Sequence, residues 1–196
     1  MSISGPLQST LAAALWPTGK GSAALRAIIL MVAGSALLAL SAQVRVPLEP
    51  VPITMQTFAV LVIGMAYGWR LGAATVLLYL AEGAVGLPVF AGGAGGLAVL
   101  IGKTGGYLIG FALAATLVGW LAEHGWDRTI ATTALAMLAG NVAIYLPGLL
   151  VLGALIGYAK AVEFGLLPFL LGDALKLLLA AAVLPFAWRL IGRPRT

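Results

Sequence analysis

Long apolar runs dominate the chain, and single charges or stretches rich in glycine and proline separate them. A helix that spans a bilayer needs about 20 mostly apolar residues. The pattern predicts six such helices, at about 23–42, 54–67, 71–85, 107–122, 130–157 and 166–190. The second and third are short and meet at a tight charged turn, Gly68-Trp69-Arg70, which favours a hairpin. We therefore predict an all-α integral membrane protein.

Composition supports this class. The chain has 196 residues, of which 62% are hydrophobic and 9% are charged, whereas a soluble domain has roughly a quarter charged residues. The net charge is +5, but the basic residues lie singly at the ends of apolar runs, which indicates membrane topology and no nucleic-acid partner. There are no cysteines, which excludes a disulfide scaffold and thiolate metal sites.

The basic residues also predict the orientation. With both termini in the cytoplasm, seven basic residues lie inside: Lys20, Arg26, Arg70, Arg128, Arg189, Arg193 and Arg195. Three lie outside: Arg45, Lys103 and Lys160. Cytoplasmic loops carry an excess of lysine and arginine, so this orientation is favoured. The membrane domain then covers 23–190, between cytoplasmic segments at 1–22 and 191–196.

Two connections on the outer side, 43–53 and 87–106, differ from solvated linkers. The first holds three prolines and the second holds eight glycines and prolines, and both are too apolar for open loops. Irregular backbone at membrane depth occurs only where it is buried in protein or lines a cavity. We predict two packed outer loops that cover the outer end of a pocket.

Asp173 and Lys176 are the first candidates for that pocket. They lie three residues apart, so they share one face of the last helix. A charge inside a membrane helix costs several kcal/mol and indicates a functional site. The alternative is an ion pair that only fixes packing.

Further polar and aromatic residues point to the same kind of site, each with a structural alternative. Asn141 and Tyr145 share one face of the fifth helix, where they bind a ligand or another helix. Thr54 is a suitable helix cap, whereas Gln56 is harder to explain as one. Tyr79 is a further candidate on the third helix, and Glu82 beside it is interpreted as interfacial. Phe90 and Tyr107 flank the glycine-rich loop, where they can stack on a flat ligand or lie in an aromatic belt.

Catalytic and nucleotide-binding functions are not favoured. Gly102-Lys103-Thr104 resembles the end of a phosphate-binding loop, but the leading glycine is replaced by Leu97 and no strand precedes it. The single histidine, His124, falls in a cytoplasmic loop, whereas an intramembrane protease or a His-ligated metal site needs a histidine at membrane depth. Active transport would therefore draw energy from another chain or from an ion gradient.

Small residues on the first helix offer a contact surface. Ser35, Ala39 and Ala42 project from nearly one face, and small residues allow another helix to approach closely. The sequence leaves open whether that helix belongs to this chain or to a second subunit.

Four blocks of the chain resemble the BioY family, the biotin-binding S components of energy-coupling factor transporters. The blocks are VPITMQT at 51–57, GLPVFAGGAGG at 86–96, GKTGGY at 102–107, and PF with GDALK at 168–176. The resemblance runs from about residue 27 to residue 190. One departure is Lys103, where the family usually has proline.

This resemblance implies six helices in the cell (inner) membrane of a bacterium and a biotin site near the outer face. It also implies a transmembrane coupling protein and ATPase subunits as partners, and no cofactor. It ties Asp173 and Lys176 to biotin binding, and it places the docking residues near Ser35, Ala39 and Ala42. The chemistry of biotin suits the candidates. Asp173 or Asn141 can accept the ureido N–H groups, and Lys176 or Lys103 can bind the carboxylate. The backbone N–H groups of Gly93, Gly95 and Gly96 can approach closely because no Cβ intervenes.

Other functions remain open at this point. An ion-driven transporter that works without partner subunits also needs buried charges at mid-membrane. A structural subunit would bind no vitamin, and an intramembrane enzyme lacks a catalytic dyad.

Overall fold

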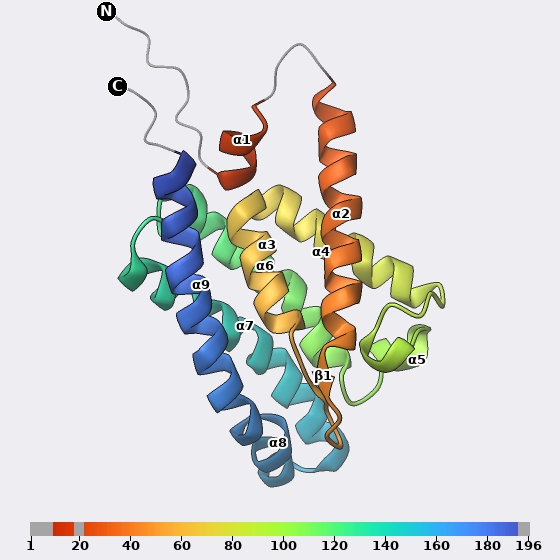
Figure 1. Ribbon diagram of the computed structural model, residues 1–196. Helices are drawn as coiled ribbons and strands as arrows, with labels where there is room; N and C mark the ends of the chain where they lie inside the picture. The colour runs from red at the N-terminus through yellow and green to blue at the C-terminus, as the bar shows by residue number, and fades with distance from the viewer. Residues whose placement is uncertain (1–9, 18–21, 192–196) are drawn as a thin grey trace, which may run out of the picture.

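The structure, a computed structural model, describes residues 10–17 and 22–191 (Figure 1). Its α-helices are α1 (Leu11–Leu15), α2 (Ala23–Gln43), α3 (Gln56–Tyr67), α4 (Trp69–Ala84), α5 (Leu97–Leu100), α6 (Gly105–Glu123), α7 (Ile130–Ile156), α8 (Tyr158–Gly165) and α9 (Leu170–Ile191). Two 3-10 helices, η1 (Ala91–Gly93) and η2 (Leu167–Phe169), and two strands, β1 (Arg45–Val46) and β2 (Ile53–Thr54), complete the fold.

The mostly helical class is confirmed, and the six predicted helices correspond to α2, α3, α4, α6, α7 and α9. The largest difference is at the start of α9, predicted at 166 and found at Leu170, because η2 occupies the preceding residues. Lys20, Arg193 and Arg195 lie outside the described residues, as do parts of the two terminal segments. The division into domains stays a prediction.

Four stretches are long and apolar enough to cross a membrane: α2, α6, α7, and the run from Tyr158 to Ile191 that contains α9. The helices α3 and α4 have 12 and 16 residues, so they are about 18 and 24 Å long at 1.5 Å per residue. The structure therefore contains several membrane-spanning helices, and the count of six stays a prediction.

Helix α6 lies at the centre of the bundle. In the most apolar 18 residues of α6, 67% are buried, whereas 17% are buried in the corresponding stretch of α2. Glycines make this central position possible, because a Cβ on Gly110 would lie 2.7 Å from the Ile144 Cα of α7, and a Cβ on Gly119 would lie 2.6 Å from the Gly68 carbonyl carbon. The two neighbouring backbones can thus approach α6 closely.

The predicted turn between the second and third helices is shorter than expected. Gly68 alone separates α3 from α4, with φ at 82°, a conformation that glycine adopts without a steric cost. Trp69 and Arg70 begin α4 instead of forming the turn. The predicted hairpin is confirmed, since α3 and α4 pack against each other where Gly64 faces Gly72.

The bundle has two distinct ends. Helix α2 begins and α9 ends at one of them, which also carries the Gly68 turn and the connection between α6 and α7 (Figure 1, top). We call it the tryptophan end, because all five tryptophans lie there: Trp16, Trp69, Trp120, Trp126 and Trp188. The opposite end, the ribbon end, carries β1, β2 and α8 (Figure 1, bottom).

The two connections predicted to be packed loops both lie towards the ribbon end. In the first, β1 and β2 form an antiparallel ribbon in which Arg45 pairs with Thr54. Its outer side is open, since Val46 is 54% exposed, so this loop is less packed than predicted. The second contains η1 and α5 and is anchored by Phe90, which is 1% exposed and forms a bridge with Ala94.

Helix α1 was not predicted. The Thr10 side chain caps it by accepting a hydrogen bond from the Ala13 N–H, and Leu11 and Ala12 are buried. Because α1 packs against α3 and α9, it closes part of the tryptophan end.

Candidate functional site

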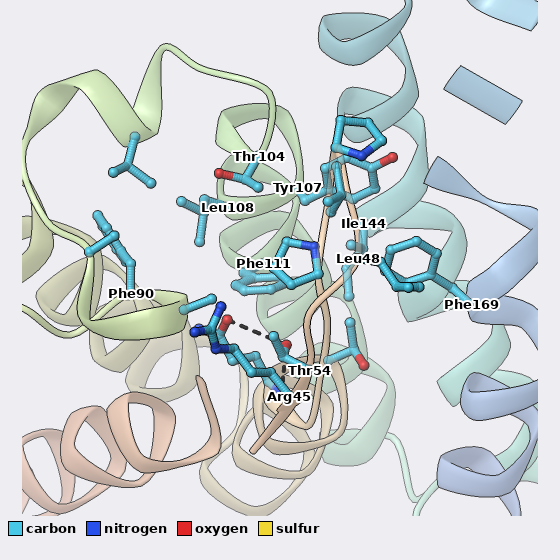
Figure 2. A pocket seen from close by; sticks show the side chains of 18 of the residues that line it. Arg45, Leu48, Thr54, Phe90, Thr104, Tyr107, Leu108, Phe111, Ile144 and Phe169 are labelled. Atoms are coloured by element: carbon cyan, nitrogen blue, oxygen red, sulfur yellow. Dashed lines mark hydrogen bonds between the residues drawn. The ribbon is translucent and has the colours of Figure 1, made fainter. Parts of the chain in front are cut away.

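A cavity of about 380 Å³ opens at the ribbon end, inside the usual range of about 300–1,000 Å³ for small-molecule sites. The two predicted loops form much of its wall: Arg45, Pro47, Leu48, Glu49, Pro50, Val51 and Pro52 come from the first loop, and Phe90, Ala91, Ala94, Val99 and Thr104 from the second. Figure 2 shows aromatic side chains around it. The predicted hollow beneath the glycine-rich stretch is therefore present.

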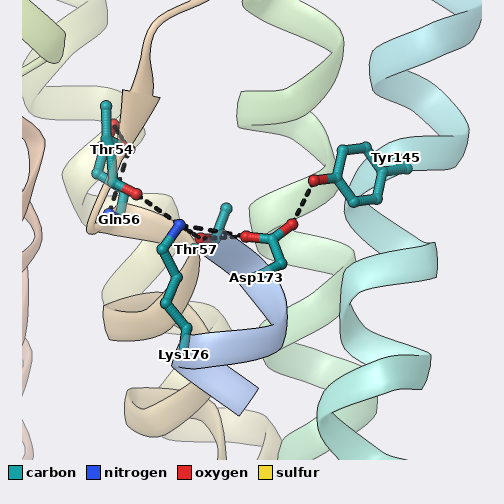
Figure 3. Close-up of polar contacts among 6 residues, drawn as sticks. All are labelled: Thr54, Gln56, Thr57, Tyr145, Asp173 and Lys176. Carbon is teal, nitrogen blue, oxygen red and sulfur yellow. Dashed lines mark hydrogen bonds and ion pairs between the residues drawn. The ribbon is translucent and has the colours of Figure 1, made fainter. Parts of the chain in front are cut away.

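A buried polar network connects α9 to the start of α3 (Figure 3). The Lys176 ammonium group donates to the Thr54 carbonyl oxygen at 2.8 Å, to Thr57 Oγ1 at 2.9 Å and to Asp173 Oδ1 at 3.1 Å. Both charged residues are buried, at 8% exposed for Lys176 and 5% for Asp173. The ion pair compensates two charges that are each costly at membrane depth.

Tyr145 links this network to the cavity. Its hydroxyl group donates a hydrogen bond to Asp173 Oδ2, and its ring lines the cavity. Two further aromatic rings meet Tyr145 edge to face, Tyr107 at 6.2 Å and Phe169 at 6.4 Å between ring centroids. Such pairs hold one another in position, so Tyr145 presents a fixed hydroxyl group between the ion pair and the cavity.

Gln56 is held from behind by Tyr79. The Gln56 Nε2 atom donates to the Tyr79 hydroxyl oxygen at 2.6 Å, and that hydroxyl group donates to the Val89 carbonyl oxygen at 3.0 Å. Tyr79 is fully buried and packs edge to face on Phe90. It therefore positions Gln56 and the second loop without lining the cavity itself.

The structure brings five of the predicted residues to the wall of this cavity: Thr54, Gln56, Phe90, Tyr107 and Tyr145. Thr54 does not cap α3, because Met55 holds that position, although Thr54 Oγ1 accepts a hydrogen bond from the Gln56 N–H.

Asn141 and Asp173 line a second cavity instead. It has a volume of about 510 Å³, lies between α7 and α9 and is walled mostly by leucines. Tyr145 lines both cavities, and it donates its hydrogen bond to Asp173, which lines the second.

The remaining predicted residues lie outside the wall. Lys103 is exposed, and neither cavity includes it. Gly93 and Gly96 have positive φ angles of 73° and 93°, and Gly95 packs against the backbone of Leu87. These glycines shape the second loop, and their N–H groups do not line either cavity as the structure describes it.

Sequence reasoning missed Arg45, Phe111 and Phe169, which all line the first cavity. Arg45 was interpreted only as an outer topological charge. The ring of Phe169 is 6% exposed, and neither it nor Phe111 differs in sequence from an ordinary apolar position of a membrane helix. Their role depends on which helix faces they occupy.

The proposed docking residues pack inside the chain. Ser35 and Ala42 are 1% and 0% exposed, and Ala39 is partly buried. The Ser35 hydroxyl group donates to Glu82 Oε2, so Glu82 faces α2 and is not simply interfacial. The chain's own helix α4 therefore covers Ser35 of this face, and docking of a second subunit near these residues stays a prediction.

Comparisons with known proteins agree with one another. Residues 12–193 match the model of the BioY family. The chain is 38% identical over 157 residues to a probable biotin transporter BioY of Pyrococcus horikoshii, covering 80% of this chain and 91% of the relative. It is 39% identical over 150 residues to the biotin transporter BioY of Thermotoga maritima, covering 76% and 88%.

The fold has a solved counterpart. The crystal structure of the S-component for biotin from an ECF-type ABC transporter matches with a TM-score of 0.76 and 23% identity, over 86% of this chain and 94% of that one. The family match also begins earlier than the resemblance in the sequence, at residue 12 instead of about 27.

Proposed function

Because the chain belongs to the BioY family, we propose that it captures biotin in the ribbon-end cavity and takes it up across the membrane. The observation that carries this proposal is the polar network of Lys176, Asp173 and Tyr145 beside a cavity of about 380 Å³. Relatives that align with more than three quarters of this chain are named biotin transporters. The family is one of transporters, so we expect no catalytic activity.

The chemistry of the site suits biotin. Its ureido group needs acceptors for two N–H groups and donors for one oxygen, and its stem needs an apolar wall. Thr54, Gln56 and Tyr145 offer hydroxyl and amide groups on the wall of the cavity. Phe90, Phe111 and Phe169 add apolar rings to the same wall. Asp173 and Lys176 lie one layer behind, where they fix the positions of Tyr145, Thr54 and Thr57.

A binding titration tests this function. Labelled biotin is added to the purified chain, because none of the five tryptophans lines the described cavity and tryptophan fluorescence is a poor reporter. We expect saturable binding that Asp173→Ala or Lys176→Ala weakens well over tenfold, or about 1.4 kcal/mol or more. Lys103→Ala is the matched control, since Lys103 is exposed and outside the cavity. Absence of saturable binding to the wild-type chain would reject the proposal.

We further propose six membrane spans with both termini in the cytoplasm. In Figure 1 the six helices run alternately between the two ends, and α2 begins at the end where α9 finishes. By their elements, Arg26, Arg70, Arg128 and Arg189 belong to the tryptophan end, and Arg45, Lys103 and Lys160 to the ribbon end. That asymmetry favours a cytoplasmic tryptophan end.

Cysteine labelling tests the orientation, since the chain has no cysteine of its own. A membrane-impermeant maleimide applied to intact cells should label Lys103→Cys and Lys160→Cys, and should label Arg70→Cys only after lysis. The opposite pattern would reverse the topology.

The energy source is also part of the proposal. We infer that this chain is the substrate-binding subunit of an energy-coupling factor transporter, with a transmembrane coupling protein and ATPase subunits as partners. A structural neighbour described as part of an ECF-type ABC transporter supports this. The alternative is an ion-driven transporter that works alone. Uptake of biotin by the chain alone in lipid vesicles, with and without an ion gradient, separates the two.

A further inference from the structure

Arg45 has a defined place on the wall of the cavity. It lies on β1 opposite Thr54 of β2, and directly opposed residues of an antiparallel ribbon project to the same face. Both side chains line the cavity, and Figure 2 shows them next to each other. The ribbon thus holds a guanidinium group close to the residue whose carbonyl oxygen receives the Lys176 hydrogen bond.

The second loop restricts how the guanidinium group can turn. A Cβ built on Gly92 would lie 2.9 Å from each of the Arg45 Cζ, Nη1 and Nη2 atoms. Three equal distances mean that the flat face of the group lies against Gly92. Its edges, which carry the N–H donors, are then directed away from that contact, and this is the arrangement that suits a planar carboxylate.

The charge of Arg45 is also available. Among the residues that the structure describes, no carboxylate oxygen lies within 4 Å of its guanidinium nitrogens. Lys176 differs, because an ammonium group has three donors and all three already have partners within the chain. Lys103, the other cation that the sequence offered for a carboxylate, is outside the cavity.

From these relationships we propose that Arg45 binds the carboxylate of the ligand, while the Lys176–Asp173 pair stays behind the cavity wall and fixes Thr54, Thr57 and Tyr145. This inference rests on the proposed function, because it takes biotin as the ligand. It changes the role expected from the sequence, in which Lys176 or Lys103 held the carboxylate. It also makes Arg45 a residue that selects ligands with a free acid.

Glu49 is the one other charged residue in the described lining of this cavity. It is exposed on the connection between β1 and β2. A like charge near the carboxylate disfavours binding, although solvent screens it. Removing Glu49 should therefore raise biotin affinity slightly, opposite to the effect of removing Arg45.

The test compares two ligands, biotin and its primary amide, on the purified full-length chain. Arg45→Gln should weaken biotin about tenfold, and it should change the affinity for the neutral amide less than twofold. The biotin affinity of the wild-type chain should fall with added salt, and that of Arg45→Gln should depend on salt much less. Lys103→Gln is the matched charge-removing control, because Lys103 lines neither described cavity, and Glu49→Gln tests the opposite sign of charge at the cavity wall.

The outcomes are distinct. Equal loss of both ligands in Arg45→Gln would mean that Arg45 only supports the Gly92 loop, and would overturn the inference. Unchanged binding of both ligands would overturn it as well, as would an equal weakening by Glu49→Gln. If the wild-type chain binds neither ligand, the proposed function itself fails, which is a separate result.

Discussion

Lys176 on the last helix donates a hydrogen bond of 2.8 Å to the carbonyl oxygen of Thr54, a residue 122 positions earlier in the chain. That bond ties α9 to the ribbon just before α3 begins, and Thr54 itself lines the cavity. The Lys176 ammonium group therefore has two roles: it holds Thr54 in place on the cavity wall, and it pairs with the Asp173 carboxylate.

The first prediction concerns that ion pair. Lys176→Met keeps an unbranched stem but leaves the buried Asp173 carboxylate without its cation, which should lower the free energy of unfolding by about 3 kcal/mol. The double variant Lys176→Met with Asp173→Asn should recover a large part of that loss, because no buried charge remains. Thermal unfolding in detergent measures both. A single variant as stable as the wild-type chain would contradict the buried pair.

The second prediction concerns Tyr145. Tyr145→Phe keeps the ring that packs on Tyr107 and Phe169 but removes the donor to Asp173. We expect a stability loss of about 1 kcal/mol and a drop in biotin affinity of about tenfold. Tyr158→Phe is the control, because Tyr158 is 61% exposed and lines only the second cavity. Equal effects of the two changes would argue against a specific role for Tyr145.

The third prediction compares two helical glycines. Gly110→Ala should separate α6 from α7, since its Cβ would lie 2.7 Å from backbone atoms of Ile144, and we expect a loss of about 2 kcal/mol. Gly172→Ala should be neutral or stabilising by up to about 1 kcal/mol, because its Cβ would meet Ile53 at an ordinary 4.0 Å. Thermal unfolding of both variants measures the difference. If Gly172→Ala is destabilised and Gly110→Ala is as stable as the wild-type chain, our interpretation of the packing is wrong.

The fourth prediction concerns Asp127, in the connection between α6 and α7. Burial raises the pKa of this carboxyl group from 3.8 to about 6, although a 2.5 Å hydrogen bond from Trp188 Nε1 lowers it. The folded chain then binds more protons than the unfolded chain between pH about 4 and 6. Its free energy of unfolding should fall as the pH rises through that range and stay constant above it.

Asp127→Asn removes the charge and keeps an oxygen acceptor for Trp188. Its stability should change little between pH 4 and 6, and it should exceed that of the wild-type chain at pH 8 by about 1–3 kcal/mol. Chemical unfolding at several pH values measures the difference. Glu163→Gln, a change at an exposed carboxylate, should show the same dependence of stability on pH as the wild-type chain. If Asp127→Asn also shows the wild-type dependence, the burial effect is contradicted.

Much of the fold follows from local pattern. Apolar runs bounded by Gly68, by the loop around Asp127 and by Gly157 set the helices α3, α4, α6 and α7 to within a few residues, because backbone groups in a bilayer must be paired within the helix. Helix α1 was missed, since five residues after Thr10 carry too little periodicity and are stabilised by packing on α3 and α9.

Sequence by itself determined that Asp173 and Lys176 are functional candidates, because a charge within an apolar run is costly wherever that helix packs. It could not decide what they contact, since the partners Thr54, Thr57 and Tyr145 come from other elements. Only the tertiary structure decided that Lys176 uses its three donors inside the chain, and that Arg45 faces the cavity with its charge unpaired by any described carboxylate. The physical reason is that the partners and the burial of a charged side chain depend on which helix faces pack together. Residue type and spacing along the chain do not specify those contacts.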